Sequence, residues 1–151
     1  MMALTISQPF ASLIASGEKW IENRTWFTTY RGPLAIHAGK GTQYLTAKEL
    51  KQYPHAAIIA VGYLVECFEL ARLDARDDDE PICTPRWSDV CSKTVGDVKA
   101  HKHAEGPWCW VLGGVVKVDA IPARGAQGLW FPSDAEGRLR ELLRKAKEAT
   151  T

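Results

Sequence analysis

Apolar residues recur at helical spacing near the start of the chain, at Phe10, Leu13 and Ile14. This spacing buries one face of a short helix. Ser7 can cap the beginning of that helix, and Gly17 suits the left-handed residue that ends it. The pattern therefore predicts a short helix that ends at Gly17, with a strand after it.

Runs rich in β-branched, aromatic and small apolar residues alternate with turn-forming residues along the rest of the chain, which predicts short strands. The segments predicted as strands are 20–27, 33–38, 56–68, 108–112, 115–121 and 129–131. Gly113-Gly114 lies between two of them and predicts a hairpin turn.

Two capping boxes, Thr46–Glu49 and Ser133–Glu136, predict a short helix that Pro54 closes and a C-terminal helix. The apolar stripe of the C-terminal helix consists of Leu139, Leu142, Leu143 and Ala146. Residues 75–105 show no sustained periodicity and are predicted to form a surface insertion. Many short strands with few helices predict one α+β domain over residues 1–151, mainly β. We expect a small β-barrel decorated by short helices and a C-terminal helix.

The composition is that of an ordinary soluble domain, with 46% hydrophobic residues, 25% charged residues and a formal net charge of +1. This balance excludes the strong basic excess of a non-specific nucleic-acid coat. The opening segment MMALTISQPF lacks the basic and long apolar regions of a signal peptide, and no apolar run is long enough to cross a membrane. We therefore expect a cytoplasmic protein without a membrane partner, in which nucleic-acid binding would come from a local patch.

The four cysteines are Cys67, Cys83, Cys91 and Cys109. They are irregularly spaced and lack CxxC pairs, so we expect reduced thiols. Two of them lie in the predicted insertion with His101 and His103, but the spacing of these four residues matches no common zinc pattern. We expect no metal and no cofactor.

A compact block of opposed charges follows the first helix, with Lys19, Glu22 and Arg24 at the predicted junction of helix and strand. As a surface ion-pair cluster, these residues would contribute little to stability. In a cleft, the lysine could hold a phosphate or polarise a carbonyl, and the glutamate could orient it or act as a general base. Because Lys19 and Glu22 would point to opposite faces of a regular strand, a shared site requires an irregular start to that strand.

The same block carries a family resemblance. Gly17, Lys19, Glu22 and Arg24 match the four fixed positions of the pattern G-x-K-x-x-E-x-R. The agreement extends to Pro9, Ala11, Leu13, Ile14, Trp26, Tyr30-Arg31-Gly32, Ile36-His37-Ala38 and residues 125–130. Over most of its length the chain resembles the activating signal cointegrator homology (ASCH) domain. The resemblance implies a fold similar to the PUA domain, a small β-barrel of RNA-modification proteins. It also implies recognition of RNA or a nucleotide, with hydrolytic activity in some relatives.

Some small ASCH proteins are amidohydrolases that act on N4-acetylcytidine through a lysine, a threonine and a strand glutamate. The resemblance implies that Lys19 is the lysine and that Glu66, which interrupts an apolar strand, is the glutamate beside it in the barrel mouth. Glu22 stands where those relatives have the threonine. This leaves a Lys–Glu pair suited to general acid–base work or phosphate contact. In the alternative interpretation, Glu66 faces outward.

A metal-independent ribonuclease is the other hydrolytic hypothesis. Cleavage by 2′-hydroxyl attack needs a base, an acid and a cation beside the phosphate. His37, which titrates near neutrality, could be the base. Glu22, Lys19 and Arg24 could supply the rest. A histidine in this position is more often structural than catalytic.

A further group of residues would bind a nucleotide rather than react with it. These predicted binding residues are Gln8, Trp26, Lys40, Trp108, Arg124 and Gln127. The tryptophans lie next to turns and could stack on a base. The glutamines could read a base edge, and the two cations lie in loops that a nucleotide could reach.

The sequence thus predicts recognition of RNA or a nucleotide, and it leaves ribonuclease and nucleoside amidohydrolase activity open. A third alternative is a non-catalytic module that recruits a partner in transcription or translation. We expect a monomer whose ligand is RNA, a nucleotide or a nucleoside, with DNA left open.

Overall fold

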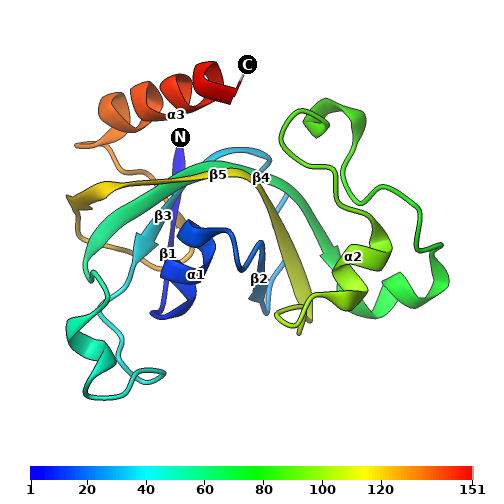
Figure 1. Ribbon diagram of the computed structural model, residues 1–151, viewed down its shortest axis with the longest axis horizontal. Helices are drawn as coiled ribbons and strands as arrows, with labels where there is room; N and C mark the ends of the chain where they lie inside the picture. The colour runs from blue at the N-terminus through cyan, green and yellow to red at the C-terminus, as the bar shows by residue number, and fades with distance from the viewer. Residues whose placement is uncertain (151) are drawn as a thin grey trace. The chain divides into compact units, whose positions relative to one another are not determined.

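The structure, a computed structural model, describes residues 1–150 and consists mainly of strands joined by short helices (Figure 1). The strands are β1 (Met2–Ile6), β2 (Ile21–Arg24), β3 (Gly32–Ala38), β4 (Ala57–Glu69), β5 (Trp108–Pro122) and β6 (Leu129–Trp130). The helices are α1 (Phe10–Ser16), α2 (Val95–Ala100) and α3 (Glu136–Thr150), with 3₁₀ turns at Glu49–Lys51, Leu70–Ala75 and Pro85–Trp87. The predicted α+β, mainly β class is confirmed, as is the C-terminal helix.

The chain is divided into two compact units. Unit 1 comprises residues 1–19, 33–62 and 115–150, and unit 2 comprises residues 20–32 and 63–114. Neighbouring strands of the sheet follow the order β2-β5-β4-β3-β1-β6, and the long strands β4 and β5 contribute residues to both units. The predicted catalytic residues are therefore distributed, with Lys19 and His37 in unit 1 and Glu22, Arg24 and Glu66 in unit 2.

Unit 1 contains β1, a strand that the sequence pattern did not predict. It pairs in parallel with β3, where Thr5 lies opposite His37, and antiparallel with β6, where Ala3 lies opposite Trp130. Leu4 of this strand is fully buried. Because β1 lies between β3 and β6, the side chain of Thr5 comes to lie next to His37.

The start of α1 is held by a glutamine rather than by the predicted serine cap. The Oε1 atom of Gln8 accepts a hydrogen bond from the Ser12 N–H at 2.9 Å, and its Nε2 atom donates to the Pro54 carbonyl at 2.8 Å. Gln8 is completely buried, so its amide stabilises the fold instead of reading a base edge. Gly17 ends the helix at φ = 86°, as predicted.

The first predicted capping box forms, whereas the glutamate of the second bonds to the N-terminus. The Thr46 N–H donates to Glu49 Oε2 at 2.8 Å, and the Glu49 N–H donates to Thr46 Oγ1 at 3.3 Å, although a 3₁₀ turn follows instead of an α-helix. Glu136 accepts instead from the Met1 amino group at 2.7 Å. The apolar stripe of α3 is confirmed, because Leu139 and Leu143 are buried. No helix in the described part of the chain is long and apolar enough to span a membrane.

The hairpin predicted at Gly113-Gly114 is wrong, because β5 runs without interruption through both glycines. Unit 2 explains their presence. A Cβ on Gly113 would lie 2.6 Å from the Val90 carbonyl oxygen, and the Gly114 N–H donates to the same oxygen at 3.1 Å. Gly114 also has φ = 56°. These glycines therefore permit a close backbone approach within a strand rather than a turn.

The predicted insertion contains the 3₁₀ turn at Pro85–Trp87 and α2, which begins with a capping box between Thr94 and Asp97. A disulfide joins Cys83 to Cys91, so the expectation of four reduced thiols is wrong for this pair. The two cysteines are therefore not available together as zinc ligands. No group of three potential metal ligands occurs among the described residues.

Candidate functional site

A cavity of about 360 Å³ in unit 1 gathers four of the residues predicted as site residues. Its lining residues are Thr5, His37, Gly39, Lys40, Ala56, Arg124, Gly125, Ala126 and Gln127. They come from β1, from β3 and the loop after it, from the residue before β4 and from the loop after β5. The sequence named His37, Lys40, Arg124 and Gln127 individually, and the fold brings them to one cavity.

A directed chain of hydrogen bonds forms one wall of this cavity. His37 Nε2 lies 2.7 Å from the Ala123 carbonyl oxygen, which can only accept, so Nε2 carries the proton. In the neutral ring Nδ1 then accepts from the Thr5 hydroxyl at 3.2 Å. The Thr5 oxygen in turn accepts from the Trp130 indole N–H at 3.1 Å. The chain from Trp130 to Ala123 thus fixes the histidine tautomer and the ring orientation.

Burial lowers the pKa of His37 below its ordinary value of 6.5, and the hydrogen bond to the Ala123 carbonyl offsets part of that shift. His37 is also only 2% exposed. A buried neutral imidazole whose two nitrogens are both hydrogen-bonded is poorly placed to take a proton from a substrate. The structure therefore favours a positioning role for His37 over the predicted role as general base.

The backbone approaches this wall closely at Gly125. A Cβ at that position would lie 2.7 Å from both His37 Cε1 and Thr5 Oγ1. On another wall, Ala56 adopts φ = 51°, an uncommon conformation for a residue with a Cβ, and its carbonyl accepts the Ala123 N–H at 3.0 Å. Thr5 and Ala56 were not among the predicted site residues, because these contacts join distant parts of the chain.

The charge of the cavity is positive. Lys40 and Arg124 are exposed at it, and none of the described residues that line it is acidic. Gln127 is also exposed and adds an amide that can both donate and accept. Two cations, an amide and no carboxylate form a site that favours an anion with polar groups attached.

The charged block of the family pattern is divided between the units. In unit 1, Lys19 is 4% exposed and its Nζ lies 5.8 Å from the centroid of the Phe10 ring. In unit 2, Glu22 is 8% exposed, and its Oε1 lies 3.2 Å from Arg24 Nε. The structure thus pairs Glu22 with Arg24, as expected for adjacent opposite charges. The catalytic role of these three residues stays a prediction.

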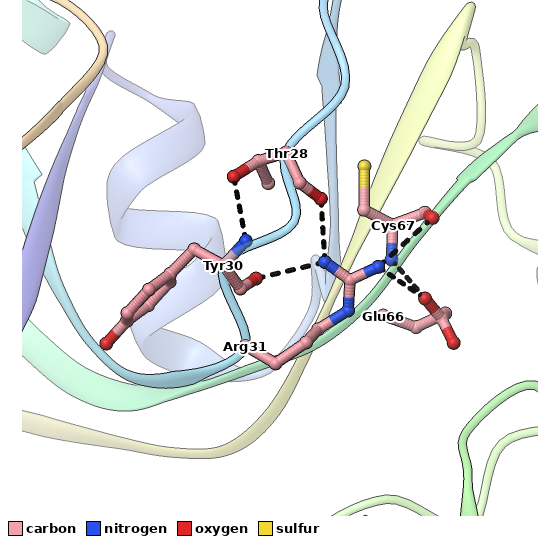
Figure 2. A network of polar contacts seen from close by, with 5 residues as sticks. All are labelled: Thr28, Tyr30, Arg31, Glu66 and Cys67. Atoms are coloured by element: carbon pink, nitrogen blue, oxygen red, sulfur yellow. Dashed lines mark hydrogen bonds and ion pairs between the residues drawn. The ribbon is translucent and has the colours of Figure 1, made fainter.

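Glu66 is held by Arg31 in unit 2, as Figure 2 shows. Its Oε1 accepts from Arg31 Nη2 at 2.6 Å and from the Cys67 N–H at 2.8 Å. The same guanidinium donates to the carbonyls of Thr28 at 2.8 Å and Tyr30 at 3.0 Å. A carboxylate with these partners is structural, so the geometry does not favour Glu66 as a hydrolytic residue.

Aromatic side chains of unit 2 include both predicted stacking residues. Trp26 is 36% exposed and packs edge-on against the buried Trp110, with ring centroids 4.7 Å apart. Trp108 is half-buried, and its ring centroid lies 5.1 Å from that of Phe27. The Phe27 side chain is 47% exposed. Phe27 was predicted only as a strand former, although it directly follows Trp26 in the sequence.

Comparisons with known proteins agree with the fold. A family model described as ASCH domain matches residues 4–118. The solved ASCH protein from Zymomonas mobilis is 14% identical, with a TM-score of 0.53, and the match covers 93% of this chain and 94% of that one. A tyrosine-to-phenylalanine variant of the same protein is 15% identical, also with a TM-score of 0.53, and the match covers 93% of this chain and 96% of that one. No curated protein matches the sequence.

Proposed function

The chain belongs to the ASCH domain family, and we propose that it recognises single-stranded RNA, with one nucleotide held in the cavity of unit 1. The observation that carries this proposal is the convergence of Lys40, Arg124 and Gln127 on a cavity without an acidic lining residue. Such a lining complements the phosphate and the polar base edge of a nucleotide.

Size supports one nucleotide rather than a duplex. The cavity volume of about 360 Å³ is in the range of pockets that bury a small ligand. RNA-binding proteins read sequence mostly on single strands, whose bases can turn away from their neighbours into such pockets. Lys40 and Arg124 would contact the phosphate, and the Gln127 amide would contact the base edge.

Recognition without cleavage is the form of this function that the hydrogen bonds favour. His37 donates to Ala123 and accepts from Thr5, so it has no free nitrogen for a 2′-hydroxyl group. The amidohydrolase hypothesis needs Glu66 at the reacting group, whereas that carboxylate is bound to Arg31. We therefore expect binding and no turnover at this cavity.

The test measures fluorescence anisotropy of labelled single-stranded RNA with the wild type, Lys40→Ala and Arg124→Ala, in chelator. Loss of one charged contact should weaken binding by about 5-fold or more in each variant. Lys117→Ala and Arg138→Ala remove exposed cations of unit 1 that do not line the cavity, so they are the matched controls. Equal affinities of all five proteins would refute the proposal.

The same samples, together with Lys19→Ala, are run on a denaturing gel, which reports cleavage. Intact RNA is expected throughout. Cleavage that disappears in Lys19→Ala would instead support the ribonuclease hypothesis for the charged block.

A further inference from the structure

We propose that Trp26 and Phe27 form a second binding surface, in unit 2, on which bases of single-stranded RNA stack. This surface, the aromatic platform, consists of the side chains of these two residues. The proposal rests on the proposed function for the identity of the ligand, but its geometry belongs wholly to unit 2.

The two rings are large and exposed, and each packs against a tryptophan of β5. Trp26 contacts Trp110 edge-on, with an angle of 85° between the ring planes, and Phe27 is tilted by 54° against Trp108. Trp110 is fully buried, and its indole N–H donates to the Trp26 carbonyl at 3.3 Å. The supporting tryptophans restrict the motion of the exposed rings, so little side-chain entropy remains to be lost when a base stacks on them.

The backbone that carries the platform is fixed although it lies between strands. Arg31 donates to the carbonyls of Thr28 and Tyr30, and the Tyr30 N–H donates to Thr28 Oγ1 at 3.1 Å (Figure 2). Glu66, on β4, anchors the guanidinium. The network therefore holds the segment after Phe27 in one conformation, which is the preorganisation that a stacking surface requires.

The surroundings of the rings favour a nucleobase over a protein partner. Thr25 and Thr29 flank them in the sequence and are exposed. Two rings with exposed threonines on either side of them in the sequence offer far less apolar area than a stable protein interface, which buries about 1,200 Å² or more. Base stacking needs only one ring face.

The experiment compares a single-stranded RNA with an abasic strand of the same length and charge. The ratio of their affinities isolates the contribution of the bases. In Phe27→Leu and Trp26→Leu this ratio should fall by about 5-fold or more, while the affinity for the abasic strand stays as in the wild type. Phe27→Tyr keeps an aromatic ring and should restore the ratio. Phe131→Leu is the matched control, because it removes an exposed ring of unit 1.

Each outcome decides the proposal. The proposal is overturned if the wild type binds the intact and the abasic strand equally well, or if neither leucine variant changes the ratio of the two affinities. The exposed rings would then be assigned to contact with a protein partner. Arg124→Ala should lower the affinity for both strands and leave the leucine-sensitive ratio in place. If Arg124→Ala and Lys40→Ala both leave the affinities unchanged while the leucine variants lower the ratio, the cavity proposal fails and the platform proposal stands. Thermal unfolding of each variant confirms that a changed ratio does not come from a misfolded protein.

Discussion

Thr5 and His37 lie opposite each other on two parallel strands, with Thr5 Oγ1 3.2 Å from His37 Nδ1. The hydroxyl oxygen accepts a hydrogen bond from the Trp130 indole, and the hydroxyl proton points to His37 Nδ1. This relationship sets the tautomer of a buried histidine at the wall of a cationic cavity. It makes the wall rigid rather than reactive.

Gly125→Ala should destabilise the protein, because the new Cβ would lie 2.7 Å from His37 Cε1 and Thr5 Oγ1. Forcing a methyl group into such a contact costs about 1–3 kcal/mol. Chemical denaturation measures the difference. Gly137→Ala in α3 is the control, since nothing lies within 4 Å of its Cβ, and its stability should be unchanged or higher. Equal stability of the two variants would contradict the close packing at Gly125.

Acidification should destabilise the wild type more than His37→Gln. The folded-state pKa of His37 lies below its unfolded value of about 6.5, so the unfolded chain binds the proton first. The stability that neutral His37 contributes is complete above that value and is lost as the pH falls through the folded-state pKa. Unfolding free energies at about pH 7.5 and about pH 5 measure the effect. An identical loss in both proteins would show that His37 does not titrate in this way.

Arg31→Met should lower the free energy of unfolding by about 2–4 kcal/mol, because it leaves Glu66 and two carbonyls without a charged donor. Both side chains of the pair are less than a quarter exposed, so water compensates only in part. Arg144→Met breaks exposed pairs with Glu141 and Glu148 and should cost less than about 1 kcal/mol. Urea titrations of both variants give the comparison, and a similar cost for the two would argue against the network.

The denatured, unreduced protein should contain two titratable thiols, Cys67 and Cys109, and four after reduction. Cys83→Ser should lower the free energy of unfolding by about 2 kcal/mol, because the chain between the two cysteines is then no longer closed in the unfolded state. Cys91→Ser should have the same effect, and the double variant should cost no more than either. Four thiols before reduction would exclude the disulfide.

The elements that sequence alone predicted well are those determined by neighbouring residues. Helix α1, its end at Gly17 and the long strand β4 depend on local spacing and on one glycine conformation. The strand β1 was missed because its short segment carries no marked alternation. Its partners lie about 30 and about 125 positions further along the chain.

The errors at the glycines have the same physical origin. Gly113-Gly114 has the composition of a turn, yet the reason for it is the Val90 carbonyl, which local sequence cannot indicate. The candidate site was predictable in part. Residue chemistry identified Lys40, Arg124 and Gln127, whereas the partners that bury Gln8 and neutralise Glu66 come from distant segments.

The position of β1 between β3 and β6 has a consequence for how the chain folds during synthesis. Two segments pair with β1, and they leave the ribosome at different times. Residues 34–38 of β3 emerge early, and residues 129–130 of β6 emerge much later. Until β6 has emerged, the Thr5 hydroxyl lacks its hydrogen-bond donor, the indole of Trp130. The loop that carries Arg124 and Gln127 is synthesised only shortly before β6. Contacts so distant in sequence slow folding. The cavity wall should therefore be among the last parts of a nascent chain to form, after β3 and β4 are already available.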